Sequence, residues 1–205
     1  MTKIFFFIII FFNLNIFNSV AGTPLTVISE DSKNEYKKAY FAGGCFWCME
    51  ESFDKVKGVI KSISGYSGGH VKNPTYKQVV YKDTGHVEVI AVYYDSKITS
   101  YEELLKVFWV NIDPFDAKGQ FCDKGKSYRS VAFYQNLMQK KLIESSIINI
   151  EKKFSKKKVV TLVWEFEKFY PAEDYHQNYY QNNFLKYLAY KSSCQREEIL
   201  SKIWN

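Results

Sequence analysis

Cys45 is the residue whose position in this sequence best suits a chemical role. It follows a predicted strand and the pair Gly43-Gly44, and it begins a predicted helix. Free backbone N–H groups and the positive end of a helix dipole favour a thiolate at such a position, and glycine lets the backbone approach a ligand closely. We therefore predict a reactive nucleophile, although a lone cysteine is commonly a buried, inert core residue.

Glu88 is a candidate acid. In an alternating strand it shares a face with Ile90, Val92 and Tyr94. Burial on such a face raises the pKa of a carboxyl group, which then stays protonated near neutrality and donates a hydrogen bond to a developing negative oxygen. If this face is exposed instead, Glu88 is an ordinary surface residue, and strand periodicity alone favours neither interpretation.

The cysteine and histidine content indicates redox chemistry rather than a metal site. The four cysteines of the chain are Cys45, Cys48, Cys122 and Cys194. The three histidines are dispersed, at His70, His86 and His176. No Cys/His set has zinc spacing, so we predict no metal. Four cysteines are too few to serve as the disulfide scaffold of a domain of this size.

Six short blocks occur in the order of a known family. They are residues 44–47 (GCFW), 65–69 (GYSGG), 73–76 (NPTY), 85–88 (GHVE), 128–130 (YRS) and 170–177 (YPAEDYHQ). Roughly from Tyr40 to Tyr180, the chain thereby resembles the A-type peptide-methionine sulfoxide reductases. One four-residue motif would be weak evidence, whereas six ordered blocks are specific.

The resemblance implies a nucleophile and two walls of a pocket. Cys45 matches the family's nucleophile, and Phe46 and Trp47 match the aromatic walls that hold the S-methyl group of the substrate. A sulfoxide is a polar S–O group on an otherwise apolar side chain, so an aromatic wall suits its methyl group. On helical periodicity alone Phe46 would be a core residue, whereas Trp47 lies off the apolar stripe.

Four further residues are implied by the same resemblance. Tyr76, Glu88 and Tyr128 match groups that bind the sulfoxide oxygen, and all three are capable hydrogen-bond donors if Glu88 is protonated. Asp123 matches an acidic residue that helps to position the substrate. His176 lies in the last block, where a structural brace is the better interpretation than a general base.

The implied activity is reduction of the S epimer of methionine sulfoxide, free or in peptides and oxidised proteins, which repairs those proteins. Thiolate attack on the sulfoxide sulfur leaves a sulfenic acid on Cys45, and a second thiol condenses with it to form a disulfide. An external dithiol then resets the enzyme by exchange. The resemblance implies no bound cofactor and a thioredoxin-like dithiol as the reductant.

The resolving thiol has three candidates, in the order Cys194, Cys48, Cys122. Cys194 lies beyond the last block, in a segment predicted to be a mobile tail. Cys48 is one helical turn from Cys45 and can pair with it as in other CxxC dithiols. Cys122 neighbours Asp123. Many family members have glycine in place of Cys48, and glycine or asparagine in place of Cys122.

The elements that must position these residues follow from periodicity and turn signals. We predict strands at 36–41, 59–66, 87–94, 130–134 and 159–166. We predict helices from about residue 45 to 57, from 100 to 112, from 136 to 152 and from 173 to 190. This order indicates an α+β fold, a two-layer ferredoxin-like mixed β-sheet with packed helices and a long C-terminal tail.

The N-terminus predicts export. Residues 1–21 carry Lys3, nine consecutive apolar residues from Ile4 to Phe12 and small residues up to Ala21, which is typical of a cleaved signal peptide. Nine apolar residues are too few to span a bilayer, so an uncleaved anchor is the less favoured alternative. We predict an N-terminal extension at 22–35 and a catalytic domain at 36–205, located in the periplasm or outside the cell.

Charge and composition limit the partners. The net charge of +6 is scattered, without a stripe of arginine and aromatic residues, so no nucleic-acid partner is predicted. We expect a monomer without stable membrane insertion after signal cleavage. Two rival functions remain at this stage. One is an exported thiol–disulfide oxidoreductase built on Cys45 and Cys48, and the other is a non-enzymatic binding domain held by two disulfides.

Overall fold

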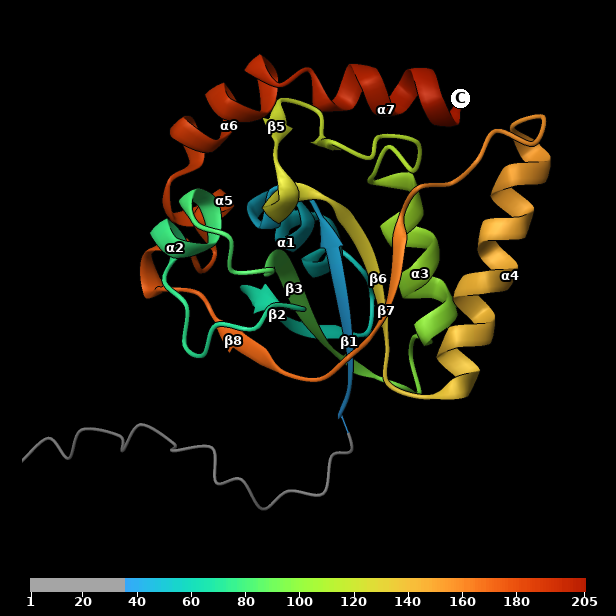
Figure 1. Ribbon diagram of the computed structural model, residues 1–205, viewed down its shortest axis with the longest axis horizontal. Coiled ribbons are helices and arrows are strands. Elements are labelled where there is room, and N and C mark those ends of the chain that lie inside the picture. The colour runs from blue at the N-terminus through green and yellow to red at the C-terminus, as the bar shows by residue number, and fades with distance from the viewer. Residues whose placement is uncertain (1–35) are drawn as a thin grey trace, which may run out of the picture. The chain divides into compact units, whose positions relative to one another are not determined.

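A six-stranded mixed sheet is the frame of the molecule (Figure 1). The computed structural model describes residues 36–205, so the predicted signal segment 1–21 and extension 22–35 lie outside the described residues. The strands are β1 Tyr36–Gly43, β2 Val59–Ser67, β3 Val87–Asp95, β4 Gly119–Gln120, β5 Asp123–Lys124, β6 Ser130–Tyr134, β7 Leu162–Glu165 and β8 Phe169–Pro171. The large sheet has the order β7-β6-β1-β3-β2-β8, and β4 and β5 form a separate pair.

The pairing is antiparallel except at one position. β1 pairs antiparallel with β3 and with β6, and β2 pairs antiparallel with β3 and with β8. Only β6 and β7 are parallel among the described strands. Since β1 and β2 both run opposite to β3, the intervening helix crosses from one to the other over a face of the sheet, which is a split β-α-β unit.

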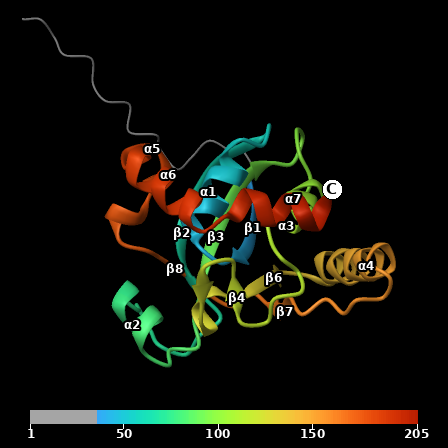
Figure 2. The same cartoon turned by 90° about the horizontal axis from the view of Figure 1, so that it is seen from above.

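Seven α-helices and two short 3₁₀-helices lie within the described residues. They are α1 Phe46–Asp54, α2 Tyr76–Tyr81, α3 Tyr101–Val110, α4 Leu137–Lys153, α5 Tyr179–Asn182, α6 Phe184–Ser193, α7 Arg196–Trp204, η1 Lys126–Tyr128 and η2 Asp174–His176. Within 36–205, no helix has both the length and the apolar character needed to cross a bilayer. Figure 2 shows α6 and α7 running across the end of the sheet where α1 begins.

The two faces of the sheet are covered differently. On one face, α1, α3 and α4 pack their apolar side chains, among them Phe53, Leu104 and Ile143, against the strands. On the other face, the strands are covered by aromatic residues such as Trp164 and Phe166 from the chain around β7 and β8. One face therefore has a helical layer, and the other has a thin cover of side chains. The predicted α+β class is confirmed.

The predicted strands agree with the observed ones, but the helix predicted at 173–190 is wrong. The segment forms η2, α5 and α6 as three separate pieces. Asn178 has φ 52° and Asn183 has φ −127°, and neither conformation continues an α-helix. The two breaks turn the chain around the start of α1, so they serve the placement of nearby side chains.

The long C-terminal tail is also wrong as a description. The residues after α6 form α7, whose Trp204 Nε1 donates to the carbonyl oxygen of Ile112 at 3.1 Å. Helix α2, in a segment expected to be irregular, was missed as well. Its signal was present in the sequence as a capping box, in which Thr75 accepts from the N–H of Gln78 and the Gln78 side chain accepts in return.

Candidate active site

The end of β1 and the start of α1 place Cys45 at one end of the sheet. Cys45 is the N-cap of α1, and its side chain makes no capping hydrogen bond. Gly44 precedes it with φ +77°, a conformation that favours glycine, and a Cβ on Gly44 would lie 2.5 Å from Cβ of Gln120. The tight turn therefore requires glycine for both backbone conformation and space.

A small cavity of about 50 Å³ opens at Cys45. It is lined by Cys45, Phe46, Trp47, Tyr76, Glu88, Asp123, Tyr128 and Tyr190. The structure therefore brings together all of the residues that the family resemblance assigned to the nucleophile, the walls and the oxygen-binding groups. Tyr190 is an addition, because nothing in the sequence distinguishes it from the other fifteen tyrosines.

Glu88 lies on the buried face of β3, so the exposed-surface interpretation is wrong. It is 2% exposed, and its Oε2 accepts a hydrogen bond from the backbone N–H of Phe46 at 3.0 Å. Burial raises the pKa of the Glu88 carboxyl well above its ordinary range, and Asp123 adds to the rise against the effect of the Phe46 N–H. Glu88 is thus a neutral acid able to donate a hydrogen bond into the cavity.

Tyr76 and Tyr128 face each other across the cavity, with their hydroxyl oxygen atoms 3.4 Å apart. Burial raises the pKa of Tyr76 to about 12 and also raises that of Tyr128, so both hydroxyls remain donors. Glu173 holds Tyr76 in place, since its Oε1 accepts from the Tyr76 N–H at 2.9 Å. Its Oε2 accepts from the Tyr66 hydroxyl at 2.9 Å.

Trp47 forms a braced aromatic wall. Its Nε1 donates to Nδ1 of His176 at 3.2 Å, and its ring stacks on Tyr179 with the ring centres 3.7 Å apart. His176 also packs against the rings of Phe46 and Tyr76. Because Nδ1 of His176 accepts from Trp47, and burial lowers the pKa of this histidine, it acts as a structural brace.

The two thiols of the CxxC segment form a hydrogen-bonded pair, and their surroundings shift their pKa values in opposite directions. Burial raises the pKa of Cys45 well above its ordinary value, with Cys48, Glu88 and Asp123 adding to the rise. The hydrogen bond from Cys45 lowers the pKa of Cys48 to about 7, against its burial. Arg196, Tyr187 and Lys191 add to this lowering.

Burial therefore works against the predicted effect of the helix start on the ionisation of Cys45. Cys45 is 5% exposed and faces carboxyl groups, whereas Cys48 faces cations. In a hydrogen-bonded pair the accepting sulfur is the more easily ionised, so the structure favours a thiolate at Cys48 over one at Cys45.

Asp123 links the cavity to the C-terminal helices. It accepts a hydrogen bond from the hydroxyl of Tyr190 on α6, and burial raises its pKa. Tyr190 in turn contacts the edge of Trp47. The C-terminal segment that follows the last family block therefore completes the pocket rather than lying apart from it.

Cys122 and Cys194 are joined in a disulfide with their Cα atoms 4.9 Å apart. Cys122 is exposed and Cys194 is buried, whereas Cys45 and Cys48 are both free and buried. Side-chain ligand atoms of Cys122, Asp123 and Cys194 lie within 4.8 Å of one another. Because both sulfurs are used in the disulfide, this group does not offer thiolates to a metal.

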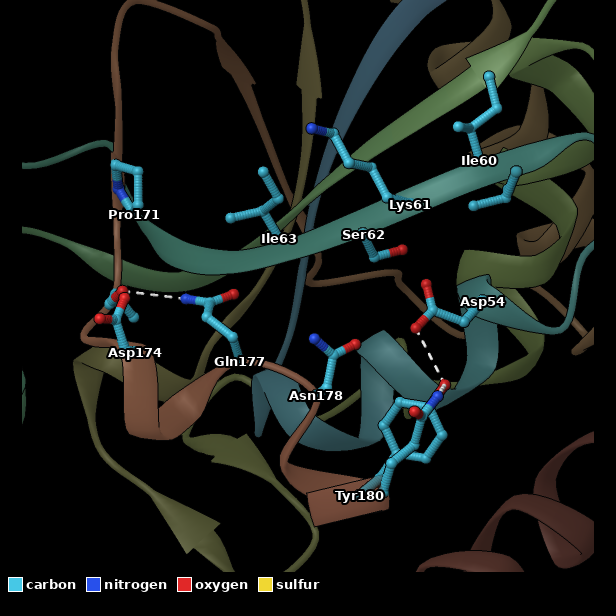
Figure 3. A pocket seen from close by; sticks show the side chains of 13 residues that line it. Asp54, Ile60, Lys61, Ser62, Ile63, Pro171, Asp174, Gln177, Asn178 and Tyr180 are labelled. Atoms are coloured by element: carbon cyan, nitrogen blue, oxygen red, sulfur yellow. Dashed lines mark hydrogen bonds between the residues drawn. The ribbon is translucent and has the colours of Figure 1, made fainter. Parts of the chain in front are cut away.

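A larger cavity of about 570 Å³ lies at the other end of α1 (Figure 3). Asp54 lines it and accepts from the hydroxyl of Tyr180 at 3.0 Å, while Ser62 projects toward it from β2. None of the residues assigned from the sequence to chemistry lines this cavity. Size alone therefore does not locate the active site.

Comparison with known proteins identifies similar sequences. The family model described as peptide methionine sulfoxide reductase matches residues 37–205. A peptide methionine sulfoxide reductase MsrA of Listeria monocytogenes is 45% identical over 175 residues, which is 84% of this chain and 98% of the relative. A peptide methionine sulfoxide reductase MsrA/MsrB of Vibrio cholerae is 42% identical over 97% of this chain. The chain spans about half (52%) of that relative's length.

Solved structures give a similar result. The reduced form of Mxr1 from Saccharomyces cerevisiae has a TM-score of 0.69 at 29% identity, covering 74% of this chain and 88% of the yeast chain. A second structure, of Mxr1 in complex with Trx2, has a TM-score of 0.50 at 22% identity, covering 72% of this chain and 87% of that chain.

Proposed function

Because the chain belongs to the peptide methionine sulfoxide reductase family, it reduces methionine sulfoxide to methionine, and we propose that Cys45 is the nucleophile of that reaction. The observation that carries the assignment is the cavity at Cys45, where an aromatic wall and three hydrogen-bond donors converge on one thiol. The substrate is the S epimer, free or in peptides and oxidised proteins.

Before the first chemical step, the methyl group and the oxygen of the sulfoxide are bound by different residues. Phe46 and Trp47 receive the S-methyl group, and Tyr76, Tyr128 and protonated Glu88 receive the oxygen. The Cys45 proton passes to Glu88 as Glu88 gives its own proton to the sulfoxide oxygen, so Glu88 is protonated again at the end of the step and Cys48 keeps its own ionisation state. The Cys45 thiolate attacks the sulfoxide sulfur while Glu88 gives its proton to the oxygen, which transfers to Cys45. Methionine leaves, and Cys45 is a sulfenic acid.

Cys48 is the resolving thiol. It is hydrogen-bonded to Cys45, it is free, and its low pKa supplies a thiolate near neutral pH. Attack of the Cys48 thiolate on the Cys45 sulfenic acid forms a disulfide, and the departing hydroxide takes a proton to leave as water. Cys194 and Cys122, the other candidates, are bonded to each other and become thiols only after that disulfide is reduced.

A thioredoxin-like dithiol restores the Cys45 and Cys48 thiols by disulfide exchange and leaves as a disulfide. The complex of yeast Mxr1 with Trx2 supports a reductant of this class. No bound cofactor takes part in these steps. Asp123 positions the substrate, in hydrogen-bonded contact with Tyr190.

Further proposals concern the molecule as a whole. The order β6-β1-β3-β2, with α1 and α3 as the connecting helices, supports a ferredoxin-like core. A signal peptide at 1–21, an extension at 22–35, export to the periplasm or beyond, and a monomer at 36–205 remain proposals. They rest on the sequence alone.

The assignment is tested with the separate S and R epimers of a peptide methionine sulfoxide and excess dithiothreitol. We expect wild-type protein to reduce only the S epimer, and Cys45→Ser to reduce neither. A Cys122→Ser variant is the matched control, because it also removes a thiol but is expected to keep the first turnover. Reduction of insulin disulfides without turnover of either epimer would instead support the rival thiol–disulfide oxidoreductase.

A further inference from the structure

Arg196 is a buried cation that forms no ion pair within the described residues, although its charge acts on the nearby carboxyl of Asp123 and lowers the pKa of that group against the effect of burial. Arg196 is 3% exposed, and no ion pair joins it to a carboxylate anywhere in 36–205. Its Nη2 donates to the carbonyl oxygen of Asn111 at 2.6 Å and of Gly43 at 3.3 Å. Burying a guanidinium against neutral groups is costly, so a nearby negative charge is expected to offset it.

The surroundings of Arg196 are those of the Cys45–Cys48 pair. Gly43 precedes the Cys45 turn, and Met49, whose Sδ lies 3.3 Å from Nη2, follows Cys48 in α1. Arg196 and Cys48 both line a cavity of about 280 Å³, which does not include Cys45. Cys45 lines the cavity of about 50 Å³ instead, so the two thiols open on different cavities.

The position of Arg196 depends on the crosslink between Cys122 and Cys194. Arg196 is two residues after Cys194, and its guanidinium lies 4.3 Å from the ring centre of Phe121, the neighbour of Cys122. Gln195, between them, has φ 52°, which ends α6 and directs Arg196 inward at the start of α7. The disulfide thus clamps the segment that carries Arg196 to the segment that carries Phe121.

We propose that Arg196, held by the Cys122–Cys194 crosslink, is a positioning residue whose fixed positive charge keeps Cys48 ionised and ready to attack the Cys45 sulfenic acid. This inference rests on the proposed role of Cys48 as the resolving thiol. The crosslink then serves the catalytic pair by placing a charge, without exchanging electrons with it during turnover.

The other charged and titratable groups around Cys48 do not replace Arg196. They are Cys45, Glu51 and Lys55 in and beside α1, Tyr187, Tyr190 and Lys191 on α6, Glu197 on α7 and Glu88 on β3. Lys55 is paired with Glu51 at 2.7 Å. Lys191 is paired with Glu51 at 2.9 Å and with Glu197 at 2.8 Å, so its charge is already balanced. Glu88 and the tyrosines carry no positive charge.

The experiment compares Arg196→Met, Arg196→Lys and the control Lys202→Met, which removes an exposed cation from the same helix. Protein with the Cys122–Cys194 disulfide intact and Cys45 and Cys48 as free thiols is mixed with one equivalent of methionine sulfoxide without reductant. Methionine formation reports the first step, and trapping of the sulfenic acid by dimedone reports the second. The pH dependence of Cys48 alkylation is followed in parallel by fragment mass spectrometry.

In Arg196→Met we expect the pKa of Cys48 to rise by about one unit, which lowers the thiolate fraction and the resolving rate at pH 7 about fivefold. The rate recovers at pH 9, and methionine formation in the first turnover is unchanged. Arg196→Lys and Lys202→Met stay within about twofold of wild type. Cys122→Ser, which opens the clamp, shifts the alkylation profile in the same direction as Arg196→Met.

Three outcomes would overturn the inference: an unchanged alkylation profile in Arg196→Met, a loss equal at pH 7 and pH 9, or an equal loss in Arg196→Lys. If Arg196→Met does not fold, Arg196→Lys and Cys122→Ser decide by the same profile. A Cys48→Ser variant that resolves the sulfenic acid at the wild-type rate would refute the proposed role of Cys48. The alkylation profile would still decide whether Arg196 sets its ionisation.

Discussion

The two cysteine pairs of this protein differ in almost every physical property. Cys45 and Cys48 are three residues apart on one helix turn, and both are free and buried. Cys122 and Cys194 are 72 residues apart, bonded to each other, and one of them is exposed. The first pair lies among groups that control its ionisation, whereas the second joins the β5 region to the C-terminal helices.

The comparison teaches that thiol chemistry depends on the neighbours of a sulfur more than on the presence of a second sulfur. Burial raises the pKa of Cys45, whereas the hydrogen bond from Cys45, helped by Arg196 and Lys191, lowers the pKa of Cys48. The Cys122–Cys194 pair has a different role, because its disulfide holds Tyr190 and Arg196 close to Cys45 and Cys48. Each of the following predictions tests whether this division of roles is correct.

The largest effect is expected for the nucleophile. Cys45→Ser should abolish methionine formation, because a serine hydroxyl is not ionised near neutral pH and cannot accept the sulfoxide oxygen in this way. The measurement is chromatography of free methionine after a single turnover without reductant. Any methionine above the background of heat-denatured protein would contradict the assignment.

Removing the acid beside Cys45 should have the next largest effect. Glu88→Ala should lower the rate of the first turnover by about 100-fold, the usual loss for one donor to a developing oxyanion. Glu88→Gln keeps a neutral donor but has no proton to give, so we expect an intermediate rate.

The pH dependence of that rate follows from the raised pKa of Glu88. The protonated form is active, so wild-type activity is retained while Glu88 stays protonated and declines as pH rises through its folded-state pKa. Glu88→Gln should lose this decline. Stability has the same sign: above the ordinary pKa of glutamate the folded state holds a proton that the unfolded state has lost, so rising pH destabilises wild type more than Glu88→Gln.

Loss of the resolving thiol should affect later turnovers only. Cys48→Ser should still form one equivalent of methionine, and it should accumulate a sulfenic acid that dimedone traps. With a thioredoxin-like reductant, its steady-state rate should fall by at least about tenfold, since no internal disulfide forms for exchange. If Cys194→Ser rather than Cys48→Ser accumulates the sulfenic acid, the two cysteine pairs have the opposite roles.

Breaking the Cys122–Cys194 disulfide should have the smallest effect on the first turnover. Cys122→Ser should leave the rate of methionine formation within about twofold, but it should lower the free energy of unfolding by about 2–4 kcal/mol, because the bond closes a long loop. Chemical denaturation with and without dithiothreitol measures this, since reduction should destabilise wild type and leave the variant unchanged. A variant as stable as oxidised wild type would show that the crosslink does not constrain the fold.

Most strands of the large sheet, and the start of α3, were predictable from the local order of apolar and capping residues. Alternating apolar residues gave the strands at 36–41, 59–66 and 87–94, and Ser100 marked the start of α3, where it accepts from the Glu103 N–H. The break before α5 was not predictable, because asparagine, here Asn178, tolerates a left-handed conformation without requiring it. The capping box before α2 was readable and was missed.

The site residues divide in the same way. Cys45 was indicated by its own surroundings, the Gly-Gly turn and the helix start, and ordered family blocks pointed to Tyr76, Tyr128 and Asp123. Tyr190 and Arg196 had no local signal. They reach the pocket only because two helices at the end of the chain fold back across α1, which short-range periodicity does not encode.

The sequence by itself determined the family and its reaction, and it pointed to Cys45 and to most of the residues that line the pocket, since these depend on residue types at fixed positions along the chain. Only the tertiary structure decided that Glu88 is buried, that the pKa of Cys48 is lowered while that of Cys45 is raised, and that Cys122 pairs with Cys194. Ionisation and disulfide pairing depend on distances between residues far apart in sequence and on how much water remains around them. Those quantities come into existence only when the chain is folded.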